Sequence, residues 1–179
     1  MRTRSLSIFL CSCLLAALVM GCSNDEIKVS DEQEILFEVN YVNYAWGYQN
    51  RGYLIDKMGR IRRYENPKDW KFASPGPLTA AEMDENLSKT TFATYTIPPA
   101  ELEQYVNVLK KVSDGDFTDP VNKMADAGAT SYYVYHFDPG TKTYRTVLLQ
   151  SVGDTDVFNR DPDAKRIADW LVTVSQKLN

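Results

Sequence analysis

Alternating apolar and polar positions predict strands near the start and in the second half of the chain. Within 35–46, four apolar side chains fall on one face of an extended segment: Ile35, Phe37, Val39 and Tyr41. Turn residues at 49–52 and 57–59 separate this segment from two shorter strands, Tyr53–Asp56 and 60–64. We expect the three to form an antiparallel meander. Segments 131–137 and 144–151 predict a second hairpin.

Helical spacing and capping residues predict three helices. Thr79 with Glu82 forms a capping box that begins a helix ending near Ser88. Pro98 and Pro99 begin the next helix, since proline lacks only an N–H that the first turn leaves unpaired. Its apolar stripe contains Leu102, Tyr105, Val106, Leu109 and Val112. Asp161 caps the last helix, Pro162 occupies its first position, and its buried face contains Ile167, Trp170, Leu171, Val174 and Leu178.

The remaining segments are expected to be loops or one short strand. Residues 90–97 are β-branched and aromatic and favour a strand, whereas 66–77 and 114–128 favour loops, the second with one helical turn near Val121. The resulting order, βββα(β)αββα, predicts an α+β fold. We expect a single antiparallel sheet of five or six strands with about three helices packed on one face.

The first 21 residues differ from the rest of the chain. Arg2 and Arg4 form a short positive region, and an apolar stretch from Leu6 to Met20 follows. This stretch is too short for a comfortable membrane-spanning helix, which needs about 20 apolar residues. A positive region followed by a short apolar region and a small residue is typical of a secretory signal.

The end of this leader, Val19-Met20-Gly21-Cys22, resembles the lipobox of bacterial lipoproteins. The resemblance implies that residues 1–21 are removed and that Cys22 is acylated, which tethers the mature protein to a membrane. Met20 departs from the usual small or polar residue two before the cysteine. The alternative is an ordinary signal peptide, or an uncleaved anchor, that happens to contain Cys22.

The residues after Cys22 indicate an address in the cell envelope. Segment 22–33 is polar and acidic and predicts a flexible tether, followed by a single domain at 34–179. Ser23 directly follows the cysteine, so the familiar inner-membrane retention signal is absent. Asp25 and Glu26 resemble the surface-export signal of lipoproteins in some Gram-negative lineages. We expect an outer-membrane, surface-exposed protein.

Charge and cysteine usage exclude several function classes. The leader contains two of the 20 basic residues and no acidic residue, which leaves 18 against 24 and a net charge of −6. A mildly acidic domain has no electrostatic footprint for nucleic acid. The three cysteines are Cys11, Cys13 and Cys22, so a mature domain has no thiol for catalysis, disulfides or a thiolate metal site. No cofactor is expected.

Two candidate catalytic or metal sites are weak. His136 is the only histidine, Asp138 shares its face, and no Gly-x-Ser-x-Gly elbow supplies a nucleophile. A packed or edge-exposed strand histidine is the competing interpretation. Segment 153–163 is rich in Asp and Asn, which suits calcium, but its spacing departs from an EF-hand loop. Helix capping and turn formation explain the same residues.

Two surface features are candidates for binding. Tyr44, Trp46 and Tyr48 surround the first turn and are candidates to grip a protein or glycan, with core or rim packing as the alternative. Tyr41 is assigned to core packing. Arg60, Arg62 and Arg63 form a basic group, either a solvated face paired with Glu38 or Asp56, or an anion site.

The functional expectation is therefore a binding module. Segment 147–171 resembles C-terminal segments of uncharacterised secreted bacterial proteins, a resemblance that implies no activity. We expect a non-enzymatic, membrane-tethered domain that binds a protein or glycan. The alternatives are a hydrolase that uses carboxylates alone, and an accessory or inhibitory subunit of an envelope protein.

Overall fold

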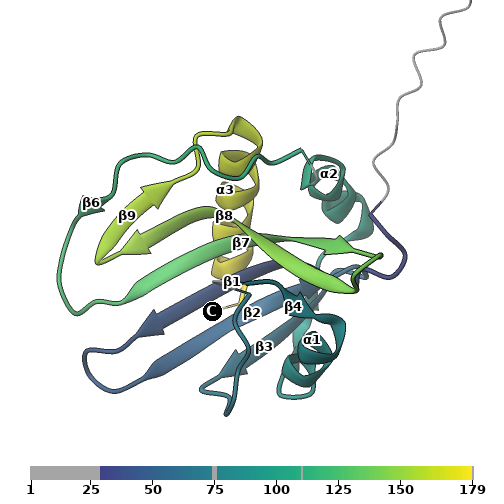
Figure 1. Cartoon of the computed structure of the whole chain (residues 1–179), viewed down its shortest axis with the longest axis horizontal. Helices are drawn as coiled ribbons and strands as arrows, with labels where there is room; N and C mark the ends of the chain where they lie inside the picture. Colours follow the sequence, from purple (N-terminus) through teal and green to yellow (C-terminus); the bar gives the residue numbers. More distant parts are fainter. Residues whose placement is uncertain (1–28, 74–75, 110, 179) are drawn as a thin grey trace, which may run out of the picture.

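The computed structural model describes residues 29–73, 76–109 and 111–178. They form an α+β fold with one open antiparallel sheet and three helices (Figure 1). The strands are β1 (Ile35–Asn43), β2 (Gln49–Asp56), β3 (Arg60–Glu65), β4 (Leu78–Thr79), β5 (Thr91–Thr96), β6 (Val121–Asn122), β7 (Ala129–Asp138), β8 (Thr143–Gly153) and β9 (Thr155–Phe158). The helices are α1 (Ala80–Leu87), α2 (Pro99–Leu109) and α3 (Pro162–Lys177).

The sheet has nine strands, so the expectation of five or six was wrong. Their order is β5-β3-β2-β1-β7-β8-β9-β6, and β4 pairs with β8. The meander β1–β2–β3 and the hairpin β7–β8 are confirmed, and β1 joins them by pairing with β7. The missed strands β4, β6 and β9 have two to four residues, too few for an alternating pattern. Val121 lies in β6 and not in a helical turn.

The helices cover both faces of the sheet, which corrects the expectation of one covered face. Helices α2 and α3 cover one face, hereafter the α3 face, where Trp170 meets Phe37 edge-on at 5.1 Å between ring centroids and stacks on Tyr105 at 4.1 Å. Helix α1 covers the opposite face, the α1 face, where Met83 packs with Leu54 in a second core. The central strands have apolar side chains on both sides, so neighbouring positions such as Leu54 and Ile55 serve different cores.

The predicted helix starts are confirmed. Thr79 Oγ1 accepts the Glu82 amide and the Glu82 carboxylate accepts the Thr79 amide, a complete capping box. Asp161 caps α3, with Pro162 at the first position. Among the described residues, no helix is both long enough and apolar enough to cross a membrane.

The chain is attached to the sheet from Val29 onward, although 29–33 was expected in the tether. Gln33 is buried, and its Nε2 donates to the Tyr135 carbonyl at 2.6 Å. The Glu32 carboxylate pairs with the Lys142 ammonium. Both cores are formed within 29–178. The expected signal peptide, Cys22 and residues 23–28 lie outside the described residues.

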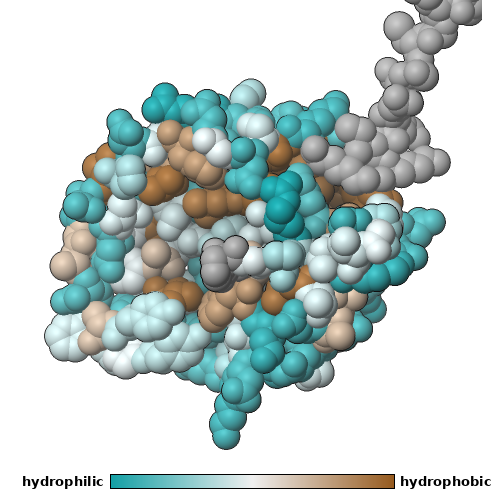
Figure 2. Space-filling view, viewed as in Figure 1, coloured by the Kyte–Doolittle hydropathy of each residue, from teal (hydrophilic) through white to brown (hydrophobic). Residues whose placement is uncertain are grey.

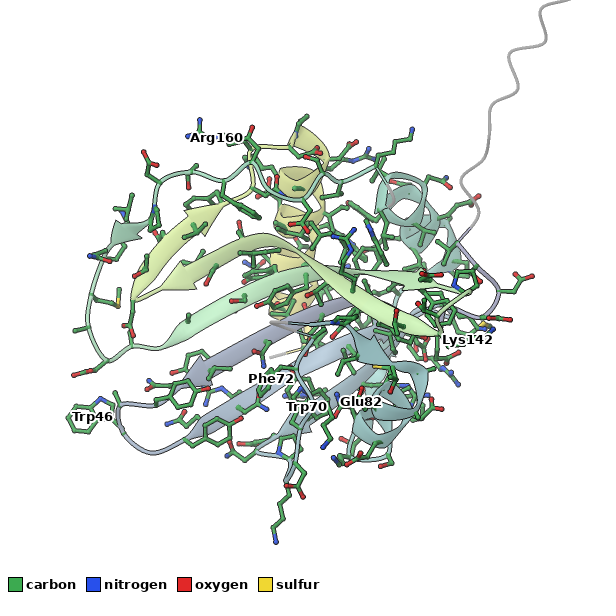
Figure 3. The ribbon with its side chains drawn as sticks, viewed as in Figure 1. Trp46, Trp70, Phe72, Glu82, Lys142 and Arg160 are labelled. Carbon is green, nitrogen blue, oxygen red and sulfur yellow. The ribbon has the colours of Figure 1, made fainter. Side chains whose placement is uncertain are left out.

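The α1 face is the one seen in Figure 2. Hydrophilic side chains form most of its rim, and neutral and hydrophobic side chains lie over the central strands. Trp70 and Phe72, in the segment before β4, lie over this middle region (Figure 3). The α1 face is thus covered mainly by α1 and residues 66–73 and 76–79, while α3 crosses the far face.

Candidate functional site

Three aromatic side chains are exposed at the turn between β1 and β2. Tyr44 is 74% exposed, Trp46 78% and Tyr48 49%. The rings of Tyr44 and Tyr48 lie 5.5 Å apart at an angle of 39°, and Trp46 projects from the end of the hairpin (Figure 3). We call Tyr44, Trp46 and Tyr48 the aromatic tip. Their exposure excludes core packing, whereas the contact between the Tyr44 and Tyr48 rings is packing at the rim, the other part of the alternative.

The base of the aromatic tip is held by hydrogen bonds. Asn43 is buried, and its Oδ1 accepts the Ala45 amide at 2.7 Å. Its Nδ2 donates to the Tyr41 hydroxyl and the Asp126 carbonyl, both at 3.1 Å. The Tyr41 hydroxyl donates in turn to the Ala127 carbonyl at 2.9 Å. The hairpin is therefore anchored to the loop before β7, which lowers the entropy that its rings would lose on binding.

The aromatic tip lies at the end of the sheet opposite to the point where the N-terminal segment joins. Strand β1 begins at Ile35 and ends at Asn43. At about 3.4 Å per residue, those two positions are about 27 Å apart. In Figure 3, Trp46 and Lys142, whose ammonium pairs with Glu32, lie at opposite ends of the sheet. A partner that contacts the tip would approach from the side away from the N-terminal segment.

A groove of about 1000 Å³ lies on the α3 face, where α3 ends and the sheet continues. The strand register places its floor residues side by side. Val39, Tyr53 and Arg63 are neighbours across β1, β2 and β3. Two residues further along β1, Tyr41 is opposite Arg51 of β2. The α3 residues Ser175, Lys177 and Leu178 form its upper wall. The Tyr41 side chain lies on the predicted face of β1, the same face as Phe37 and Val39. It lies beyond the end of α3, however, so it lines this groove and is not part of the core.

The groove is positively charged although the chain as a whole is acidic. Arg51, Arg63, Lys89 and Lys177 line it, against Glu65. The Arg51 guanidinium lies 4.3 Å from the centroid of the Tyr41 ring. Within the described residues, neither Arg51 nor Arg63 has a carboxylate oxygen within 4.0 Å of its guanidinium. The groove therefore suits an anionic ligand.

A buried carboxylate lies at the centre of the α1 face. Glu38 accepts the Tyr64 hydroxyl at 2.7 Å and the Tyr135 hydroxyl at 2.6 Å, one on each oxygen. Burial raises the pKa of Glu38, and the two hydrogen bonds oppose that rise. Burial, and then the charge of Glu38, raise the pKa of both tyrosines well above 10. The network satisfies the carboxylate without a cation. Of its members, Tyr64 also lines the groove, whereas Glu38 and Tyr135 do not.

The weak catalytic and metal candidates are used structurally. His136 Nε2 lies 3.1 Å from the Leu109 carbonyl, and its Nδ1 lies 3.3 Å from Arg145 Nη2. Asp138, its expected partner, instead accepts the amide of Gly140 at 2.8 Å. In segment 153–163, Asp154 accepts the amides of Ala127 and Gly128. Among the described residues, no three His, Cys, Asp or Glu side chains are grouped to hold a metal ion.

The basic group Arg60, Arg62 and Arg63 is divided between the two faces. Buried Asp56 lies 2.7 Å from Arg60 Nε and 3.5 Å from Arg62 Nε, as the paired interpretation expected. Glu38, the other expected partner, bonds to tyrosines instead. Arg63 points to the opposite face and lines the groove. The three arginines thus do not form one anion site.

Two features were missed by sequence reasoning. The groove arises from the end of α3 meeting strands β1, β2, β3 and β5, and no local pattern reports where a helix ends against a sheet. For the Glu38 network the sequence offered only a partial signal. Glu38 alternates with Phe37 and Val39, which places it on the opposite face of the strand, but the pattern does not report that this face is also covered.

Comparison with models of known protein families, with curated proteins and with solved structures yields no match.

Proposed function

We propose that this chain is a lipid-anchored envelope protein whose domain binds a partner protein through the aromatic tip. The observation that carries the proposal is the exposure of Tyr44, Trp46 and Tyr48 on a hairpin that hydrogen bonds of Asn43 anchor at its base. Exposed aromatic side chains on an anchored base are the residue type that dominates protein–protein binding energy. The lipid on Cys22, inferred from the lipobox resemblance, would tether the domain at the opposite end.

The shape of the tip favours a protein partner over a glycan. Tyr44 and Tyr48 are inclined by 39°, so their rings do not form one flat platform for sugar rings. Trp46 projects outward from a convex turn, a form that inserts into a pocket of a partner (Figure 3). Tyr and Trp lose little side-chain entropy on binding because each has only two rotatable side-chain bonds.

The carboxylate-hydrolase alternative gains no support from the groove. General acid–base hydrolysis needs two carboxyl groups about 5–10 Å apart across a substrate. Among the described residues that line the groove, Glu65 is the one carboxylate. Glu38 and Asp56 are buried elsewhere and engaged with tyrosines and arginines. An accessory or inhibitory subunit would use the same tip and is a special case of the proposal.

The tip is tested with the double variant Trp46→Ala, Tyr48→Ala. We expect it to keep the wild-type melting temperature, since both side chains are exposed, and to lose capture of the partner from envelope extracts. Met58→Ala is the matched control, because Met58 is 63% exposed at the β2–β3 turn, at the other end of the sheet. Equal capture by both variants would contradict the role of the tip. If the wild-type domain captured no protein but bound to a glycan array, the partner would be a glycan.

The anchor is tested separately with Cys22→Ala and a tagged fatty acid. The expected result is loss of label from the variant in growing cells, because Cys22 is the inferred acceptor. Undiminished labelling would refute lipidation at Cys22. It would leave the binding role of the tip standing, since the tip residues lie in the folded domain and capture by them does not depend on the lipid.

A further inference from the structure

Among the described residues, no strand pairs with the outer side of β5, so one edge of the sheet is open there. Strand β5 pairs with β3 on one side and is the last strand in the sheet order, whereas the strand at the other edge, β6, has only two residues. The six residues of β5, Thr-Phe-Ala-Thr-Tyr-Thr, contain no charge and no proline. Proteins usually protect a sheet edge with charged residues or proline, because the unpaired N–H and C=O groups of an edge strand can pair with a further strand. Strand β5 has neither kind of protection.

The open edge borders the groove on the α3 face. Residues 91–95 of β5 line the groove, and strand alternation turns Thr91, Ala93 and Tyr95 toward the α3 face. Phe92 lies on the opposite face, with the Arg62 guanidinium 4.3 Å from its ring centroid. A strand added to β5 would therefore direct every second side chain over the groove.

The cations of the groove lie within reach of those side chains. Arg63 is directly opposite Thr91 in the register. Lys177 Nζ donates to the Tyr95 hydroxyl at 2.9 Å and lies 3.7 Å from Glu101. Lys89 pairs with Glu85 at 2.9 Å. Arg63, at one end of β5, donates from Nη1 to the Leu178 carbonyl at 3.5 Å and, like Arg51, has no carboxylate partner among the described residues. Lys177 is at the other end of β5.

We propose that the β5 edge binds an extended acidic peptide segment of another protein as an additional antiparallel or parallel strand. Main-chain hydrogen bonds to β5 supply affinity, and carboxylates at alternate positions pair with Arg63 and Lys177. This site is independent of the aromatic tip, which lies at the β1–β2 turn.

Two other occupants are less well suited. An anionic polysaccharide would pair with the cations but leave the backbone groups of β5 unpaired. A second copy of the chain would bring two cationic grooves together along the same edge, where like charges repel. Only an acidic extended peptide satisfies both the backbone edge and the charges.

The test measures binding of labelled peptides to the domain from residue 29 onward, which contains both cores. The probe is an end-blocked octapeptide of alternating Glu and Val, and its matched control is an octapeptide of alternating Lys and Val. Binding of each peptide is measured by fluorescence anisotropy. We expect binding of the acidic peptide only, and slower amide hydrogen exchange in 91–96 when it is bound. Arg63→Glu and Lys177→Glu should each weaken binding about tenfold, the effect of losing one charge-assisted contact.

Control variants separate this site from other effects. Lys165→Glu changes the charge of α3 by the same amount at a position paired with Asp169, outside the groove, and should leave binding unchanged. Trp46→Ala should also leave it unchanged, so failure here and failure of the tip are distinguishable. Binding of polygalacturonate without the acidic peptide, a dimer lost on Arg63→Glu, or unchanged exchange in 91–96 would each overturn the proposal.

Discussion

At the scale of single residues, Gly52 allows Tyr64 to reach the buried carboxylate. Gly52 lies between Asn40 and Tyr64 in the register, so the Tyr64 ring crosses over β2. Its hydroxyl accepts from Asn40 Nδ2 at 2.9 Å and donates to Glu38 at 2.7 Å. A Cβ atom on Gly52 would lie 2.7 Å from the Tyr64 hydroxyl and 2.1 Å from the Val39 carbonyl. Only glycine fits at this crossing.

Gly52→Ala is therefore expected to destabilise the domain by about 2–3 kcal/mol, because both the tyrosine and a backbone carbonyl must move. Urea unfolding at pH 7 measures the change. Gly76→Ala is the matched control, since no atom lies within 4 Å of a Cβ at that position. If the two variants unfolded at the same urea concentration, the position of the Tyr64 ring would not depend on the absence of a side chain at Gly52.

Glu38 makes stability depend on pH. Its folded-state pKa lies above the usual 4.5 because of burial, so folding favours the protonated form. The contribution is fully present below pH 4.5 and is lost as pH rises through the folded-state pKa. Glu38→Gln keeps the neutral form at all pH values. We expect the stability of this variant, relative to wild type, to increase as pH rises from 4.5 toward neutral.

The measurement is the free energy of unfolding by urea at intervals from pH 4 to 8, with Glu103→Gln on exposed α2 surface as a control for net charge. A constant difference between Glu38→Gln and wild type across this range would contradict a raised pKa.

At the scale of elements, Asp161 connects the start of α3 to the segment after α2. Its Oδ1 accepts the Asp163 amide at 2.8 Å and its Oδ2 accepts the Ser113 amide at 2.9 Å. One carboxylate thus caps the helix and fixes a loop. Because the C-terminal end of α3 forms the upper wall of the groove, this cap also helps to set the groove's position.

Asp161→Ala should destabilise the domain by about 1–2 kcal/mol, as expected for an N-cap that serves two amides. Asp163→Ala keeps the cap and removes only a first-turn charge, which is worth about 0.5 kcal/mol. Thermal and urea unfolding of both variants give the comparison. Equal losses would mean that Asp161 acts through charge alone.

At the scale of the whole molecule, local patterns predicted the long elements, and long-range pairing decided the rest. The capping box at Thr79 and the cap at Asp161 were readable because each is contained within four residues. The two-residue strand at Val121 was not, since its pairing with Asp156 depends on a contact 35 positions away. Helix α1 was expected on the same face of the sheet as the other helices. The apolar residue Met83 shows that the helix has a buried side, but it does not show which face of the sheet that side covers.

The candidate sites divide in the same way. The aromatic tip was found from sequence because its residues are adjacent in the chain, although core packing was the competing interpretation until their exposure was known. The groove was not found, because Arg51, Arg63 and Lys177 come from β2, β3 and α3 and meet only in the folded sheet.

The central claim is that the aromatic tip contacts a partner away from the tethered end. A photoactivatable amino acid at position 46 in the full-length protein in cells tests it most directly, with position 58 as the control at the other end of the sheet. We predict a discrete protein adduct from position 46 after illumination, abolished when Tyr44 and Tyr48 are both changed to alanine, and none from position 58. Adducts of equal yield at both positions, or none at position 46, would contradict the account.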